Sequence, residues 1–305
     1  MAVMACMTCS CRDEEPLPDP VPPVMEPENP GNPEEPDTGK VYIGIAPIIE
    51  NMQEQRAVVE NWKEGHCLGV TAAGDVNIPF TFDGRRWKAE KQVEVTAEQK
   101  VSAYYPYNVQ YTDMTAIPVD ITTQEDYMYG EGGVSVEKPS AVLVMKHALS
   151  LVRILIKKND YTGDGRVDAV TFGGVRLSAS MDVTSGKLLP TGQPGEYKAG
   201  GNYTLDDASP VYVEAILMPV GTAEGITVNV HVDGRDFTYA LPPTHVWNPG
   251  MIYAYTLNMK SGYNCEVDVD HVPMDEEYWS TFGKTDRIVT VSYTHLRAHE
   301  TTLHL

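Results

Sequence analysis

The sequence predicts an all-β protein, and three observations support this class. The 305-residue chain contains 25 glycines and 22 prolines, residues that interrupt helices and form turns. From residue 41 to residue 259, short segments rich in Val, Ile, Thr and Tyr alternate with Gly, Pro, Asn and Asp, which is the pattern of strands joined by tight loops. The longest apolar run is Ala141–Lys158, and the alternation within Val152–Lys157 favours a strand over a helix. We therefore expect this run to form the buried central strand of a sheet.

Composition and charge exclude a chain that is disordered throughout and a protein that binds nucleic acid. Hydrophobic residues make up 42% of the chain, which is enough for apolar cores, so the chain is not disordered throughout. The formal net charge of −20 repels nucleic acid and anionic lipid headgroups. We therefore expect no nucleic-acid partner, and the sequence indicates no cofactor.

Residues 1–11 are typical of the end of a lipoprotein signal, although the basic region and most of the apolar core of such a signal are missing. They are small and apolar, and Arg12-Asp-Glu-Glu15 follows them. Because Ser10 is a small residue suited to signal-peptidase cleavage, we predict that Cys11 is lipidated; Cys6 is a weaker alternative. Acyl chains on this cysteine would anchor the chain to a membrane. A start from a wrong reading frame is the competing interpretation.

Residues 12–39 are predicted to be a disordered tether. Pro, Glu, Asp and Asn replace almost every core-forming residue there, so the segment cannot bury enough apolar area to offset the entropy lost on ordering. Its prolines favour extended polyproline II, which at about 3 Å per residue would hold a domain well away from the lipid surface.

Two β domains are expected after the tether, at residues 40–139 and 140–290. Gly130–Gly133 and Pro139 interrupt the strands just before the central run and set this boundary, while Ser185–Gly201, also rich in Gly and Pro, is the competing boundary. The expected strands of the first domain are Val41–Ile49, Cys67–Val70, Val76–Phe82, Gln92–Thr96 and Lys100–Tyr107. Those of the second are Val167–Leu177, Val211–Met218, Ile226–Val232, Asp236–Leu241 and Met251–Met259.

A series of short motifs resembles the fimbrillin family, which comprises the type V pilins and fimbrillin-like lipoproteins of Bacteroidetes. The motifs are Gln55-Arg-Ala57, Trp62–Val70, Ile78–Phe82, Arg86-Trp87, Tyr104–Tyr107, Gln124–Gly130, His147–Leu151, Ala215–Pro219 and Asn248–Leu257. Their order along the chain, rather than any single motif, carries the resemblance. The likeness covers roughly residues 41–259.

The resemblance implies a fold, a location and a mode of assembly. The fold is two β-sandwich domains of transthyretin-like topology, and the location is the cell surface, as an outer-membrane lipoprotein. The role is that of a structural, tip or anchor subunit of a fimbria, with other fimbrial subunits as partners. In this family an Arg-specific protease removes an N-terminal segment, and a strand from another subunit fills the exposed groove by β-augmentation.

The residues that match this assembly scheme lie between the tether and Trp62. Arg56 and Ala57 form the predicted processing site, in a polar connection where a protease could bind. Val41–Ile49 is the predicted removable strand, and an uncleaved first strand is the alternative. The side chains expected to fill its groove are those of Tyr42, Ile43, Ile45 and Ile48.

The alternative function is a glycan-binding surface lipoprotein, whose partner would be a host or bacterial surface glycan or protein. Tyr104, Tyr105 and Tyr107 surround Pro106, and flat aromatic faces stack on sugars. Packing in a core or an interface is the other interpretation of these rings.

Neither a metal site nor a catalytic site is predicted. Asp160–Asp168 resembles a calcium loop, but Thr162 and Thr171 stand at its third and twelfth positions, and the twelfth position requires a carboxylate. We interpret the loop as a turn and His147 as a hydrogen-bonded structural residue. The sequence contains no nucleophile elbow, phosphate loop or histidine pair with ligand spacing, so a secreted hydrolase is only a third hypothesis.

Residues 291–305 are left out of the predicted fold. The segment Val291–Thr301 resembles the translation of a sequencing adapter, so we expect the native chain to end or continue differently near Thr290. The difference matters for assembly, because these pilins use their C-terminal strand in it.

Overall fold

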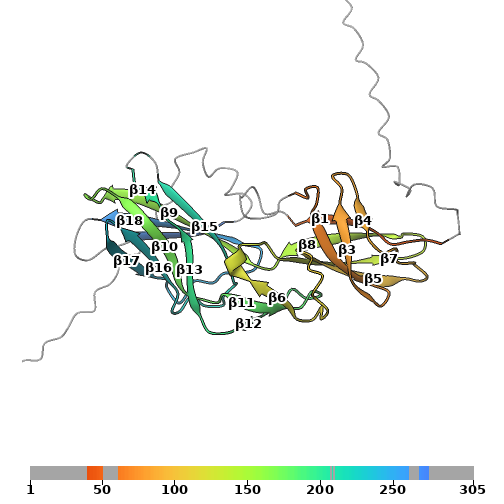
Figure 1. Ribbon diagram of the computed structural model, residues 1–305. Helices are drawn as coiled ribbons and strands as arrows, with labels where there is room; N and C mark the ends of the chain where they lie inside the picture. The colour runs from red at the N-terminus through yellow and green to blue at the C-terminus, as the bar shows by residue number, and fades with distance from the viewer. Residues whose placement is uncertain (1–39, 51–60, 207, 209, 261–267, 275–305) are drawn as a thin grey trace, which may run out of the picture. The chain divides into compact units, whose positions relative to one another are not determined.

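The computed structural model describes residues 40–50, 61–206, 208 and 210–260, and the backbone alone of 268–274 (Figure 1). All of the described residues belong to one compact unit, within residues 40–305. They form strands and turns, with one 3₁₀ turn, η1 (Ile121–Thr123), among them. The prediction of an all-β fold is confirmed.

The first sheet has seven strands in the order β1-β8-β7-β5-β2-β3-β4. These strands are β1 (Gly44–Ile49), β2 (Cys67–Ala72), β3 (Asp75–Phe82), β4 (Trp87–Ala89), β5 (Gln99–Tyr105), β7 (Met128–Val134) and β8 (Ser140–His147). Ala73 and Gly74, between β2 and β3, both have positive φ, as a type I′ hairpin turn requires. β1 and β8 run parallel, whereas the other neighbours are antiparallel. The first strand of the chain therefore lies at a sheet edge, beside the last strand of the same sheet.

Three smaller sheets contain the remaining strands, in the orders β15-β9-β18-β19, β13-β10-β16-β17 with β14 beside β10, and β12-β11-β6. The early strands of these sheets are β6 (Ile117–Asp120), β9 (Ser150–Asp160), β10 (Arg166–Val175), β11 (Ser178–Met181), β12 (Leu188–Thr191) and β13 (Gly195–Gly200). The later ones are β14 (Tyr203–Thr204), β15 (Val211–Leu217), β16 (Thr227–Val232), β17 (Arg235–Ala240), β18 (Ile252–Lys260) and β19 (Asp268–Met274).

The buried side chains form two clusters. One lies against the seven-stranded sheet and includes Phe80, Leu143 and Met145. The larger cluster joins the three smaller sheets. At its centre the Trp247 indole donates a hydrogen bond to the Tyr255 hydroxyl at 2.8 Å, so the polar group of this fully buried ring is satisfied.

The apolar run 141–158 forms two strands in different sheets, so the prediction of a single central strand was wrong. Between β8 and β9 the hydrogen-bonding neighbours change: Ala148 N donates to Tyr127 O, and Gly250 N donates to Leu149 O, both at 2.8 Å. β8 alternates between buried and exposed residues, whereas β9 is buried from Ser150 to Ile156. The change of sheet is hidden in the sequence because the exposed positions of β8 include apolar residues.

The change of sheet also bears on the division into domains. β8 follows residue 139, yet it pairs with β1 and β7 of the first sheet. We therefore propose that the chain finally leaves the first β domain at Ala148–Leu149, just after β8, although the earlier β6 already pairs with β11 of the second.

The strand predictions were correct in most places and incomplete in others. The predicted strand Gln92–Thr96 is reduced to one bridge, between Glu94 and Tyr42. The strands that were not predicted include β4, β6, β7 and β11 to β14.

Candidate functional site

β1 is the strand predicted to be removable, and it lies at the edge of the seven-stranded sheet (Figure 1). On one side β8 pairs with it along its whole length. On the other side residues 93–95 form backbone hydrogen bonds of 2.9 and 2.7 Å to residues 41–43. The groove that holds the segment 41–49 thus has β8 along residues 44–49 on one side and residues 93–95 along residues 41–43 on the other.

The side chains of this segment alternate between the core and the surface, as in any strand. Ile43 and Ile45 are 7% and 8% exposed, and Pro47 is also buried. Ile48 is 56% exposed, and Tyr42, which has the same parity, is half-buried. The prediction that Tyr42 and Ile48 fill the groove was therefore wrong, because they lie on the opposite face from Ile43 and Ile45.

The buried face of β8 continues the buried face of β1. Ala141, Leu143 and Met145 are fully buried in the same cluster as Ile43 and Ile45. Full burial of one Ile side chain is worth about 1.5–3 kcal/mol. Any strand that replaces β1 would need apolar side chains at alternate positions to recover this contribution.

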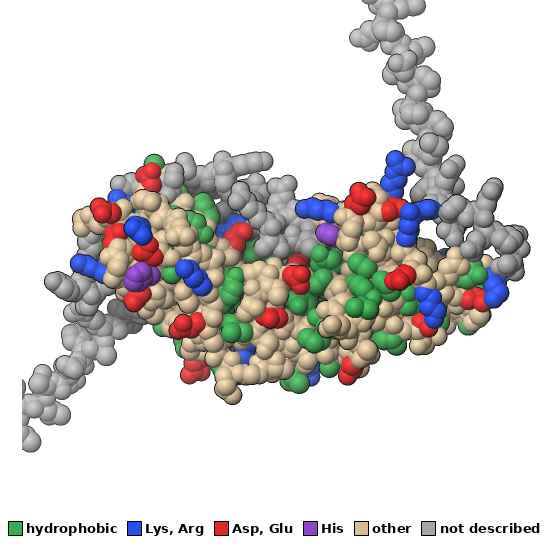
Figure 2. All heavy atoms as spheres, viewed as in Figure 1, with side chains coloured by type: hydrophobic (Ala, Val, Ile, Leu, Met, Phe, Trp, Pro, Cys, Tyr) green, Lys and Arg blue, Asp and Glu red, His purple; other side chains and the backbone are tan. Residues whose placement is uncertain are grey.

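The outer face of the edge pair is apolar as well. Val142 and Val144 are 55% and 42% exposed, and they stand opposite Ala46 and Ile48 in the β1–β8 register. Figure 2 shows hydrophobic side chains gathered on the part of the surface that the seven-stranded sheet forms, with acidic and basic side chains interspersed around them. Ala46, Ile48, Val142 and Val144 therefore form an apolar strip and not a charged binding surface.

The three tyrosines predicted to contact a glycan occupy different environments. Tyr104 is fully buried, and its hydroxyl donates to Asn77 Oδ1 at 2.8 Å. Burial raises the pKa of Tyr104 to about 12. Its ring is a core side chain, so its prediction as a sugar contact was wrong. Tyr105 and Tyr107 are half-buried, and a glycan contact there stays a prediction.

The loop that resembles a calcium site is closed by a carboxylate from another hairpin. Asp233 accepts hydrogen bonds from the Tyr161 hydroxyl and Gly165 N at 2.8 Å and from Arg166 N at 2.9 Å. Asp233 and Gly234 both have positive φ and form the type I′ turn between β16 and β17. The loop is a turn, as interpreted from the sequence. In the part of the chain that the structure describes, no group of three or more His, Cys, Asp or Glu side chains could hold a metal ion.

Asp233→Asn is expected to destabilise the protein in a pH-dependent way. Burial opposes ionisation, but hydrogen bonds from Gly165, Tyr161 and Arg166 outweigh it and hold the pKa of Asp233 below its usual value. Such a carboxylate stabilises the fold above its unfolded-state pKa of about 3.9, and this contribution is lost as the pH falls through the folded-state pKa. We expect a loss of about 1–2 kcal/mol in the free energy of unfolding near neutral pH.

Urea unfolding at about pH 7 and about pH 3 measures this effect. The difference between Asp233→Asn and the parent protein should shrink at the lower pH. Asp164→Asn removes an exposed carboxylate of the same loop and serves as the control, with little change at either pH. An Asp233→Asn effect that is equal at both pH values would contradict the prediction.

His147 is a hydrogen-bonded structural residue, in agreement with its interpretation from the sequence. Its Nδ1 lies 2.8 Å from Asp126 Oδ2, and the two side chains are only 2% and 3% exposed. Asp126 lies two residues before β7, and His147 ends β8. The pair therefore joins two strands of the first sheet where the chain leaves it.

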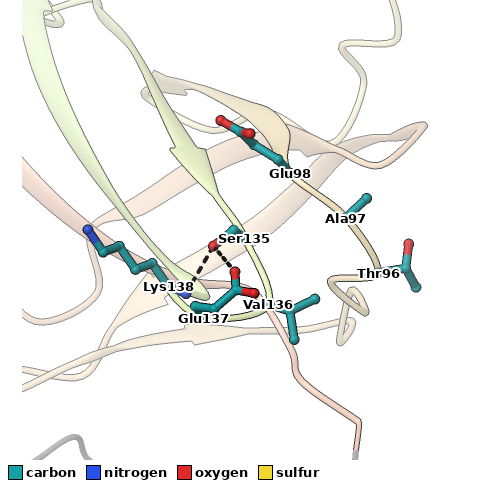
Figure 3. A pocket seen from close by; sticks show the side chains of 7 residues that line it. All are labelled: Thr96, Ala97, Glu98, Ser135, Val136, Glu137 and Lys138. Atoms are coloured by element: carbon teal, nitrogen blue, oxygen red, sulfur yellow. Dashed lines mark hydrogen bonds between the residues drawn. The ribbon is translucent and has the colours of Figure 1, made fainter.

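An open hollow lies beside the turn between β7 and β8 (Figure 3). It is lined by Thr96, Ala97, Glu98, Ser135, Val136, Glu137 and Lys138. Ser135 Oγ donates to Glu137 Oε2 at 2.9 Å and accepts from Lys138 N at 3.2 Å. These two hydrogen bonds lie within the β7–β8 turn, so part of the polar lining is used by the turn itself.

Several predicted sites lie outside the described residues, and they stay predictions. These are Cys6, Cys11, Arg56, Ala57 and the tail 291–305. Cys67 is described and is a half-buried free thiol, whose pKa is raised by burial. None of the helical segments that the structure describes is long and apolar enough to cross a membrane.

The described residues define a class of protein: an all-β protein of the β-sandwich type, with several sheets around two apolar cores. A proposed cell adhesion protein from Bacteroides uniformis has a similar structure, with a TM-score of 0.62 at 18% identity over 78% of this chain and 99% of that one. Another, from Bacteroides ovatus, has a TM-score of 0.58 at 18% identity over 77% of this chain and 96% of that one. At such identities the likeness shows the fold alone. No curated protein matches the chain.

The chain belongs to the fimbrillin-like family, whose model matches residues 56–270. This match confirms the resemblance seen in the order of the motifs. Membership of this family makes the chain a fimbrial protein of the cell surface. The matched region begins at Arg56, after β1.

Proposed function

We propose that the chain is a lipid-anchored subunit of a cell-surface fimbria, and that the groove under β1 receives a strand from another subunit. The observation that carries this proposal is the position of β1 at a sheet edge, where β8 pairs with it on one side, while residues 93–95 bond to the residues just before it. Removal of residues 41–49 would leave backbone N–H and C=O groups of β8 and of residues 93–95 unpaired and would expose Leu143 and Met145. An extended segment with alternate apolar side chains would form the missing backbone hydrogen bonds and would cover the exposed apolar side chains.

The extent of the family match supports a separable first strand. The fimbrillin-like model begins at residue 56, so β1 precedes the matched region although it completes the sheet. A segment that is discarded before assembly is under fewer constraints than the body that is kept. Arg56 itself is the residue predicted to be cleaved.

The lipid and β1 lie on the same side of Arg56. Cleavage there would therefore open the groove and separate the body from Cys11 and its acyl chains in a single step. An uncleaved copy would keep its groove filled and would remain in the outer membrane. Cleaved copies would thus serve as structural subunits, and an uncleaved copy would serve as the anchor.

Cleavage by a trypsin-like protease is expected to convert monomers into oligomers. After cleavage and release of β1, each body has an unfilled groove, so the size distribution should shift upward with protein concentration, as measured by light scattering after size-exclusion chromatography. Arg56→Ala is the matched control and should stay monomeric under the same treatment. A body that is cleaved at Arg56, loses β1 and remains a monomer in a chain with its authentic C-terminus would overturn strand exchange.

Lipidation is expected at Cys11, since a small residue precedes it and an acidic run follows it. In cells grown with a clickable palmitate analogue, Cys11→Ala should abolish labelling, because the acceptor thiol is lost. Cys6→Ala serves as the control and should keep the label. Equal labelling of the parent and Cys11→Ala would assign the acyl chains to another residue.

A further inference from the structure

The backbone groups of β1 point alternately toward β8 and away from it. Glu50 N donates to Met145 O, and Gly44 N donates to Pro139 O, so even-numbered residues of the strand direct their N–H groups to the β8 side. Odd-numbered residues direct theirs away from it, as Ile43 N does toward Val93 O. Pro47 is odd-numbered, so its missing N–H removes no bond to β8.

The Pro47 carbonyl also faces away from β8, beyond the reach of the backbone wall at residues 93–95. There the Trp62 indole Nε1 donates to Pro47 O at 2.9 Å, in a part-buried bond. A single side chain thus takes the place of a strand on this side of the groove.

Aromatic neighbours hold the Trp62 ring. Trp87 and Tyr105 pack edge-on against it, with ring centroids 5.1 and 5.8 Å away, and His66 does the same at 5.9 Å. These residues come from β4, β5 and the segment before β2. The indole N–H is therefore presented to the groove by the body of the protein and not by β1 itself.

We propose that Trp62 is the latch of the groove: it holds the Pro47 carbonyl now, and it would hold a main-chain carbonyl of the incoming strand after β1 has left. The second half of this proposal rests on the proposed strand exchange. Trp62 follows Arg56 in sequence, so it stays with the body when β1 departs. The partner it fits is an extended segment of another subunit with apolar side chains at the positions of Ile43, Ile45 and Pro47.

The latch can be tested in the full chain with a site-specific protease sequence placed between residues 51 and 60. After the cut, β1 is held by non-covalent contacts alone, and its release into an excess of competing peptide of residues 40–50 gives a dissociation rate. Trp62→Phe keeps a ring but removes the donor, so release should become about five- to tenfold faster. Trp87→Phe keeps a ring that touches Trp62 and changes no described bond to β1, so its rate should stay close to that of the parent.

A second measurement separates the hydrogen bond from packing. A synthetic peptide of residues 40–50 with a thioamide at the Pro47 carbonyl, a weaker acceptor, should bind the cut and emptied parent less tightly than the normal peptide does. Trp62→Phe should not distinguish the two peptides, since the pair is coupled. Equal release rates for Trp62→Phe and the parent, or a thioamide effect that persists in Trp62→Phe, would overturn the latch.

The β1 release rate and the formation of oligomers test separate claims. If the cut protein forms oligomers but Trp62→Phe releases β1 at the parent rate, the latch is wrong and strand exchange stands. If Trp62→Phe releases β1 faster and no oligomers form, the latch holds β1 and strand exchange falls.

Discussion

Asp126→Ala is expected to lower the free energy of unfolding by about 1–3 kcal/mol, because it leaves the buried His147 imidazole without its hydrogen-bond partner. His147 Nδ1 lies 2.8 Å from Asp126 Oδ2, with neither side chain more than 3% exposed. In the described residues, His147 Nε2 is also buried without a hydrogen-bond partner. The imidazole would therefore lose its only described polar contact and remain buried.

The chain offers a matched control for this prediction. His231 and Asp236 form a pair with the same 2.8 Å separation, but their side chains are 37% and 66% exposed. Asp236→Ala should change the stability by less than about 1 kcal/mol, since water replaces the lost partner. Urea unfolding of both variants makes the comparison. Similar losses in the two variants would show that burial of the His147 pair is not what stabilises the first sheet.

The fold class could be predicted from local patterns, while the pairing of strands could not. Segments such as Val211–Leu217 and Thr227–Val232 carry alternating side chains and turn residues that identify strands directly. Which strand lies beside which depends on contacts between distant residues. Nothing in the local sequence of Gly44–Ile49 indicates that its partner is Ser140–Met145, almost a hundred residues later.

The candidate site was predicted only in part, because local patterns identify a strand but not which of its side chains are buried. The apolar alternation of residues 41–49 identified a strand, but its parity in the groove was assigned incorrectly for Tyr42 and Ile48, because both faces carry apolar residues. Tyr104 was misassigned because a tyrosine next to other tyrosines gives no sign of burial. Its partner Asn77 is on β3. The sequence indicates no separate role for Trp62, since a bond to a backbone carbonyl leaves no signal in it.

β7 was missed because its glycines indicate a turn when only the sequence is considered. In the structure Gly130 and Gly132 permit the backbone of β8 to approach. A Cβ at Gly130 would lie 2.6 Å from Val144 O, and a Cβ at Gly132 would lie 2.5 Å from Val142 O. Both carbonyls belong to β8, the strand that pairs with β1 and forms one side of the groove.

Gly130→Ala and Gly132→Ala are each expected to cost about 1–3 kcal/mol of stability, because a backbone carbonyl cannot move aside as a flexible side chain can. Displacement of β8 would disturb its pairing with β1, so release of β1 from the cut protein should also become faster. Gly133→Ala, on the same strand, is the control: its Cβ would lie 3.8 Å from the nearest atom, Gln99 O, which is ordinary contact. Urea unfolding and the β1 release rate give the two measurements. If all three variants behave alike, the close approach of β7 and β8 does not hold the groove in shape. If only Gly130→Ala and Gly132→Ala speed the release of β1, the glycines of β7 set the position of β8. An incoming subunit would have to pair with that strand.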